Sequence, residues 1–138
     1  MNRIIMDTGP LVAWFCPKDS HHDWAIKSLD QVSAGALVCE AVLAEACHLV
    51  AKDGVPPSGV LKLVERNDLV LVSLARDVSA IRSLMECYAD VPMDFADAAV
   101  VRLAELHARA TVCTCDGHFR FFRKNSRETI PLLAPFSD

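Results

Sequence analysis

The chain has 138 residues and a formal net charge of −4, which is long enough for one domain with a buried core. Its apolar segments are far shorter than the roughly 20 residues that span a membrane, and no secretory signal pattern opens the chain. These features favour a single cytoplasmic domain over residues 1–138 with no membrane segment, and they exclude a protein that binds nucleic acid through its overall charge alone.

The predicted elements alternate between short apolar strands and helices. In chain order the pattern predicts strand 3–6, helix 9–15, helix 23–32, strand 36–39, helix 40–54, helix 56–67, strand 68–74, helix 76–90, helix 94–108, strand 111–115 and a last strand at 130–133. Pro10 suits the first turn of its helix, where no backbone N–H is needed, and Gly54 suits a helix end. No internal repeat or linker interrupts this order.

Strands that alternate with helices of roughly 10–15 residues predict an α/β fold, in which helices cover both faces of a mainly parallel sheet of about five short strands. In such sheets the ligand site lies outside the carboxyl ends of the strands. Asp7 and Asp116 each follow a strand at this end. The topology therefore directs attention to the acids.

The six cysteines lie within apolar segments and form no CxxC pair. This distribution is typical of reduced, buried thiols in a cytosolic protein. A zinc site built on cysteine ligands is therefore disfavoured. The residues concerned are Cys16, Cys39, Cys47, Cys87, Cys113 and Cys115.

Each acid has a structural explanation when it is considered singly. Asp7 could cap the helix that follows it, and Asp116 could be a turn residue before Gly117. Glu45 is harder to explain, because three of its four neighbours at helical spacing are apolar. A carboxylate on a largely apolar helix face is a candidate for function.

Asp94 and Asp97 lie three residues apart where an apolar helix begins. Asp94 as N-cap and Asp97 in the first turn form something close to a capping box, which the positive end of the helix favours. Asp97 also shares its face with Val100 and Val101. We therefore expect Asp97 to point to the edge of the sheet and Asp94 to serve mainly as the N-cap.

Four acids come from two strand ends and two helices that a parallel sheet would bring to one edge: Asp7, Glu45, Asp97 and Asp116. Carboxylates gathered there repel one another unless cations lie among them. Ligand sets made only of oxygen select Mg²⁺ or Mn²⁺ rather than zinc. Such ions can activate a water and neutralise phosphate oxygens during an in-line displacement.

The sequence resembles the PIN-domain ribonucleases, and more closely the toxin components of VapBC toxin–antitoxin modules, over nearly the whole chain. Four segments carry the resemblance: IIMDTGPLVAWF, VCEAVLAEACHL, MDFADAAVVRLAE and VCTCDGHFRFF. Transferred residue by residue, the resemblance implies that the catalytic metal ligands are Asp7, Glu45, Asp97 and Asp116. Thr8 would assist Asp7 through its hydroxyl, and Thr114 and Asp94 are secondary candidates.

The resemblance also implies a fold, an activity and partners. The fold would be a PIN-like three-layer α/β/α sandwich. The activity would be Mg²⁺- or Mn²⁺-dependent endonucleolytic cleavage of RNA in single-stranded or loop regions. The expected partners are the RNA substrate, a cognate antitoxin protein and a second copy of the chain in a homodimer.

The segment HFRFFRKNSR, residues 118–127, interleaves basic and aromatic side chains. Phosphate contacts by Arg120, Arg123 or Lys124, together with stacking by an exposed phenylalanine, would supply an RNA groove that the net charge does not. The alternative is that the phenylalanines belong to the core and the charges are merely solvated.

Three other functions are compatible with parts of the pattern. A PIN nuclease of RNA maturation would have much the same sequence and would differ in its gene neighbourhood. A catalytically silent PIN-like scaffold that binds RNA or protein would be expected to lack one or more of the four acids, and all four are present. A phosphoacceptor domain built on Asp7 is disfavoured, because no DxD pair follows the first strand.

Overall fold

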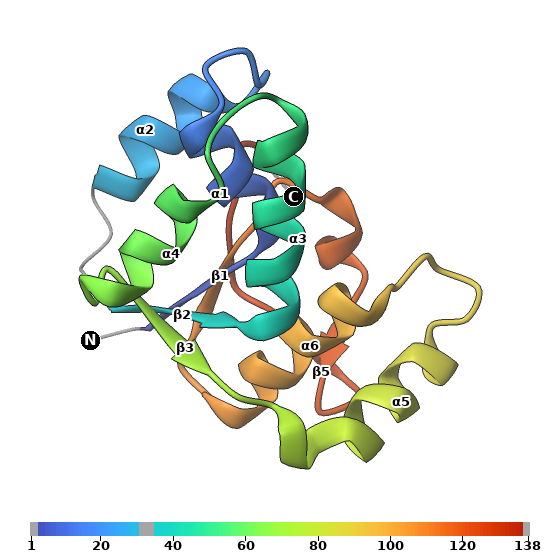
Figure 1. The fold of residues 1–138 in the computed structure, drawn as a ribbon. Helices are drawn as coiled ribbons and strands as arrows, with labels where there is room; N and C mark the ends of the chain where they lie inside the picture. Colours follow the sequence, from blue (N-terminus) through green and yellow to red (C-terminus); the bar gives the residue numbers. More distant parts are fainter. Residues whose placement is uncertain (1–2, 31–34, 137–138) are drawn as a thin grey trace.

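The computed structural model describes residues 3–30 and 35–136, and its centre is a five-stranded sheet in the order β3-β2-β1-β4-β7. All neighbouring strands in this sheet run parallel (Figure 1). The strands are β1 Ile4–Met6, β2 Ala36–Cys39, β3 Leu69–Val72, β4 Thr111–Cys113 and β7 Leu132–Leu133. The predicted sheet, mainly parallel and with about five short strands, is confirmed.

Helices connect successive strands and cover the sheet. They are α1 Thr8–Phe15, α2 His22–Asp30, α3 Glu40–Lys52, α4 Ser58–Glu65, α5 Val78–Cys87 and α6 Phe95–Leu106. Parallel crossovers are right-handed, which places α1–α4 on one face and α5 and α6 on the other. The packing agrees, since α1 contacts α2 and α3, whereas α5 contacts α6 (Figure 1). None of the helices in the described residues is both long and apolar enough to span a bilayer.

The central strand β1 fixes the site, because its register sets which residues reach the carboxyl edge together. Met6 on β1 pairs with Cys113 on β4, and the Asp7 N–H donates to the Cys113 carbonyl at 3.0 Å. Thr114 follows β4, and its N–H donates to the carbonyl of Leu133 on β7, the neighbouring strand on the other side of β4, at 3.1 Å. Asp7 and Thr114 therefore leave the sheet side by side from a buried, hydrogen-bonded base.

Helix α6 contributes more buried residues than any other helix in the described residues. Seven of its twelve residues are buried, and all seven are Ala, Val or Leu. It packs against β1, β2 and β4 as well as α3 and α5. Burial of a helix on this scale holds its N-terminus rigidly at the edge of the sheet, where Asp94 and Asp97 lie.

The main differences from the predicted elements lie in three places, and the ends of other elements shift by one or two residues. Helix 76–90 is a 3₁₀ turn η1, Ala75–Asp77, followed by α5. Strand 111–115 ends at residue 113, because the chain turns away to bring Asp116 over the edge. A small hairpin of β5 Arg123–Lys124 and β6 Glu128–Thr129 was not predicted. Residues 31 and 32 of predicted helix 23–32 lie outside the described residues.

The cysteines are reduced, as predicted, since all six are free thiols. Three of them are buried in the core, but the prediction of burial is wrong for Cys87, which is exposed at the end of α5. Cys87 was expected to be buried because its segment is apolar, but the composition of a segment does not decide which side of a surface helix a side chain faces. The partly exposed Cys115 lies at the candidate site described next.

Candidate active site

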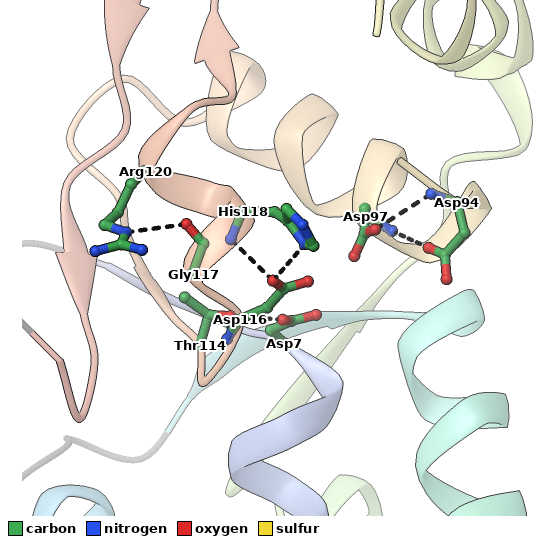
Figure 2. Close-up of polar contacts among 8 residues, drawn as sticks. All are labelled: Asp7, Asp94, Asp97, Thr114, Asp116, Gly117, His118 and Arg120. Carbon is green, nitrogen blue, oxygen red and sulfur yellow. Dashed lines mark hydrogen bonds and ion pairs between the residues drawn. The ribbon is translucent and has the colours of Figure 1, made fainter. Parts of the chain in front are cut away.

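Asp7 follows β1 and is buried, with 5% of its surface exposed. Its Oδ2 accepts a hydrogen bond from the Thr114 hydroxyl at 2.7 Å. The same hydroxyl oxygen accepts from the Asp116 backbone N–H at 2.9 Å, so one fully buried threonine connects two candidate acids (Figure 2). Thr114 is therefore a positioning residue.

Asp116 lies between β4 and the 3₁₀ turn η2, Gly117–Arg120, and is the N-cap of that turn. Its Oδ1 accepts from the His118 backbone N–H at 2.9 Å and lies 2.9 Å from His118 Nδ1. The predicted turn role is thus confirmed, and it directs the carboxylate toward Asp7 (Figure 2). A structural cap and a functional acid are compatible here, because only one carboxylate oxygen is used by the cap.

Asp94 and Asp97 open α6 as a complete capping box. Asp94 Oδ1 accepts from the Asp97 N–H at 2.8 Å, and Asp97 Oδ2 accepts from the Asp94 N–H at 3.2 Å (Figure 2). The predicted N-cap role of Asp94 is confirmed. Both acids also line the cavity that Asp7 faces, so Asp94 is nearer to the site than a purely structural cap would be.

One cavity of about 360 Å³ collects all of the predicted acids. Six carboxylates line it, together with Thr8, Gly9 and Cys115: Asp7, Asp19, Glu45, Asp94, Asp97 and Asp116. Glu45 enters from the middle of α3, as its apolar helical neighbours indicated. Asp19, in the loop between α1 and α2, was not predicted, because a loop has no periodicity that assigns a side chain to a face.

Burial and the neighbouring charges both perturb the carboxylates of the cavity. Burial raises the pKa of Asp7 to about 6, against hydrogen bonds from Thr114 and the Thr8 backbone that lower it, and the charges of Asp116 and Glu45 raise it further. Burial likewise raises the pKa of Asp97 to about 7, with the neighbouring acids, Asp94 first, adding to the effect. The cavity therefore disfavours its own negative charge and would gain free energy from a bound cation.

The donor atoms in this cavity fit a hard cation. Carboxylate oxygens predominate, and the Thr8 hydroxyl is buried with no hydrogen-bond partner among the described residues. An unpartnered buried oxygen next to carboxylates is suited to a metal ion or its water. Within residues 3–30 and 35–136 no three His, Cys, Asp or Glu side chains are close enough to hold one ion directly, so the ligand set of Asp7, Glu45, Asp97 and Asp116 stays a prediction.

Two of the three basic residues predicted to contact RNA have structural roles. Lys124 is buried, with 5% exposure, and its Nζ donates to the Ala108 carbonyl at 3.0 Å. This buried position does not favour a phosphate contact, and RNA contact by Lys124 stays a prediction. Arg123 Nη1 donates to the carbonyls of Arg120 and Phe122. Of these three residues, only Arg120 is exposed.

A parallel sheet in this strand order, with carboxylates gathered at its edge, defines a PIN-like α/β fold. The structure superposes on that of VapC20 from Mycobacterium tuberculosis, described as a toxin that cleaves the sarcin–ricin loop, with a TM-score of 0.76 over 83% of this chain and 90% of that chain. The sequences are 14% identical. No protein-family model and no curated protein sequence matches the chain. The likeness confirms the PIN-like fold that the sequence resemblance implied.

Proposed function

We propose that the protein is a metal-dependent endoribonuclease that hydrolyses phosphodiester bonds in single-stranded or loop regions of RNA. The observation that carries this proposal is the cavity itself, where four predicted acids from four separate elements meet at the carboxyl edge of the sheet. The structural likeness to VapC20, a toxin that cleaves an RNA loop, supports the choice of RNA as substrate and of toxin as biological role.

Each residue of the cavity would have a separate role in the reaction. Bound Mg²⁺ or Mn²⁺ would supply an activated water and neutralise charge on the phosphate. Asp7 would be the most rigid ligand, because it is buried and held by Thr114. The other carboxylate ligands of the metal would be Asp97, Glu45 and Asp116. The Thr8 hydroxyl would hydrogen-bond a water or a phosphate oxygen. The enclosing apolar residues Val12 and Leu49 would limit access of bulk water.

A toxin of this kind requires a partner that silences it. We propose that a cognate antitoxin inserts a basic side chain among the acids, since clustered carboxylates with raised pKa values form a ready site for a guanidinium. A homodimer is part of the same proposal. Expression should arrest growth, and coexpression of the cognate antitoxin should restore it. If expression proves harmless in the native host, the toxin role is refuted while the nuclease remains.

The nuclease is tested by incubating the purified protein with structured RNAs in Mg²⁺, in Mn²⁺ and in a chelator. We expect cleavage in either metal, none in chelator, and a loss of at least about a hundredfold for Asp7→Asn. Glu86→Gln, which removes the same charge from the exposed surface of α5, is the matched control and should cleave normally. Cleavage that survives both the chelator and Asp7→Asn would exclude this mechanism and favour a silent scaffold with a contaminating nuclease.

A further inference from the structure

The segment after Asp116 presents one aromatic ring to solvent from a rigid base. Phe119 and Phe122 are buried, and their rings pack edge to face with centroids 5.1 Å apart. Tyr88 packs against Phe122 at 5.3 Å and accepts a hydrogen bond from the Arg123 N–H at 2.8 Å. Between these anchors, the Phe121 side chain is 59% exposed. An exposed ring on an immobilised backbone costs little entropy to use in binding.

The Arg120 guanidinium is held next to this ring. It lies 5.8 Å from the Phe121 centroid and 5.1 Å from the Phe136 centroid, and its Nε donates to the Gly117 carbonyl at 3.1 Å. A Cβ on Gly117 would lie 3.0 Å from Arg120 Nη2, so the glycine makes room for the cation. Figure 2 shows Arg120 on one side of Gly117 and Asp116 on the other. The cation is thus fixed to the carbonyl of Gly117, the residue that follows Asp116.

A groove runs along this cation and ring. It has a volume of about 590 Å³ and is lined by residues 119–121 and 129–132. This volume falls in the range of roughly 300–1,000 Å³ that is usual for small-ligand sites. The lining mixes aromatic carbon, the Pro131 ring and a guanidinium, which is the composition that accepts a flat, polar, partly anionic group.

We infer that Arg120 and Phe121 form a stacking platform for one unpaired nucleobase of the RNA, next to the phosphate that is cleaved. The inference rests on the proposed nuclease function and adds a subsite to it. Stacking on an aromatic ring or a guanidinium plane is how proteins hold unpaired RNA bases, and the Arg120 charge attracts the adjoining phosphate. In a chain of net charge −4, the Arg120 cation on the segment that follows Asp116 would supply a local attraction for RNA.

The test measures RNA binding in chelator, where no cutting occurs, and cleavage in Mg²⁺ with the same proteins. The probes are a short fluorescent single-stranded RNA, the same RNA with one abasic nucleotide moved along it, and a fully base-paired RNA. The variants are Phe121→Ala, Phe121→Trp, Arg120→Lys and Arg120→Gln. Leu61→Ala and Arg82→Lys, which change exposed residues on α4 and α5, are the matched controls.

We expect Phe121→Ala to weaken binding of the single-stranded RNA by roughly 5- to 100-fold, Phe121→Trp to retain it, and duplex binding to change little. Arg120→Lys should keep the salt dependence but lose part of the affinity, because an ammonium does not stack. One abasic position should weaken wild-type binding and leave Phe121→Ala unaffected, which identifies the stacked base. Cleavage at limiting RNA should fall in proportion to binding.

The outcomes separate the subsite from the enzyme. If wild type cuts RNA and Phe121→Ala binds and cuts as well as wild type, the platform is refuted and the nuclease stands. If wild type neither binds nor cuts any RNA, both proposals fall. If binding follows the predicted pattern but no RNA is cut, the platform stands and the nuclease falls. Conversion of a wild-type dimer to a monomer by Phe121→Ala, with RNA binding intact, would assign the ring to a contact between copies and refute the platform.

Discussion

Replacing Asp7 by asparagine should stabilise the metal-free protein while abolishing its activity. The Asp7 carboxylate is buried and its pKa is raised from 3.8 to about 6, so ionisation opposes folding. A raised acid pKa means that stability is greatest below the unfolded-state value and declines as pH rises to the folded-state value. The decline for wild type should therefore fall between about pH 4 and pH 6 and level off above that range.

The size of the effect follows from this shift. A rise from 3.8 to about 6 corresponds to roughly 3 kcal/mol of stability that ionised Asp7 removes near neutral pH. Asparagine carries no charge, and its amide oxygen can still accept from the Thr114 hydroxyl. In chelator near pH 8, Asp7→Asn should therefore be more stable than wild type by up to about 3 kcal/mol, and the difference should vanish near pH 4.

The assay is denaturant unfolding across this pH range, in chelator and again in Mg²⁺, with Glu86→Gln as the control for loss of one negative charge. A metal that binds only the folded state stabilises it by mass action. Mg²⁺ should therefore raise the free energy of unfolding of wild type and have little effect on that of Asp7→Asn. The stability advantage of Asp7→Asn should then shrink or change sign. An Asp7→Asn protein that is less stable than wild type at every pH in chelator would refute the conclusion that burial, together with the neighbouring charges, makes ionised Asp7 destabilising.

Three further variants test the surroundings of the site. Asp94→Ala should lower stability by roughly 0.5–2 kcal/mol in denaturant melts while Asp94→Asn does not, because asparagine also caps helices. Lys124→Met should lower stability by roughly 1–3 kcal/mol, since the Ala108 carbonyl loses its donor, with RNA affinity of the folded protein unchanged in a binding titration. Gly9→Ala places a Cβ 3.0 Å from the Cys115 Cβ and should slow cleavage, and adding Cys115→Gly should restore the rate.

Much of the fold was predictable because it depends on local patterns. Short strands that alternate with helices specify a parallel sheet, and a parallel sheet specifies which edge collects the residues after β1 and β4. The capping box of Asp94 and Asp97 was predictable for the same reason, since both its hydrogen bonds lie within one turn. Glu45 could be identified because a carboxylate on an apolar helix face has no structural explanation of its own.

The features that were missed depend on turns and on long-range packing. The β5–β6 hairpin reverses at Asn125 and Ser126, whose φ angles of 51° and 70° are uncommon for residues other than glycine and are not indicated by the surrounding charges. Lys124 lies on that hairpin, so its burial could not be predicted from the sequence. Asp19 could not be assigned from sequence either, because the loop that carries it is placed by the packing of α1 against α2.

The hydrogen bonds in the acidic cavity explain how it can be both rigid and reactive toward cations. Asp7 is held by a neutral hydroxyl, and Asp94 and Asp97 are held by each other's backbone N–H. Among the described residues none of these acids forms an ion pair with lysine or arginine, and only His118 approaches Asp116. An internal guanidinium would fix the same positions but would also neutralise the site. Neutral donors fix the geometry and leave the negative charge uncompensated. Burial and mutual repulsion of the carboxylates therefore destabilise the folded chain, and a metal ion or a partner's cation that enters the cavity would relieve that destabilisation.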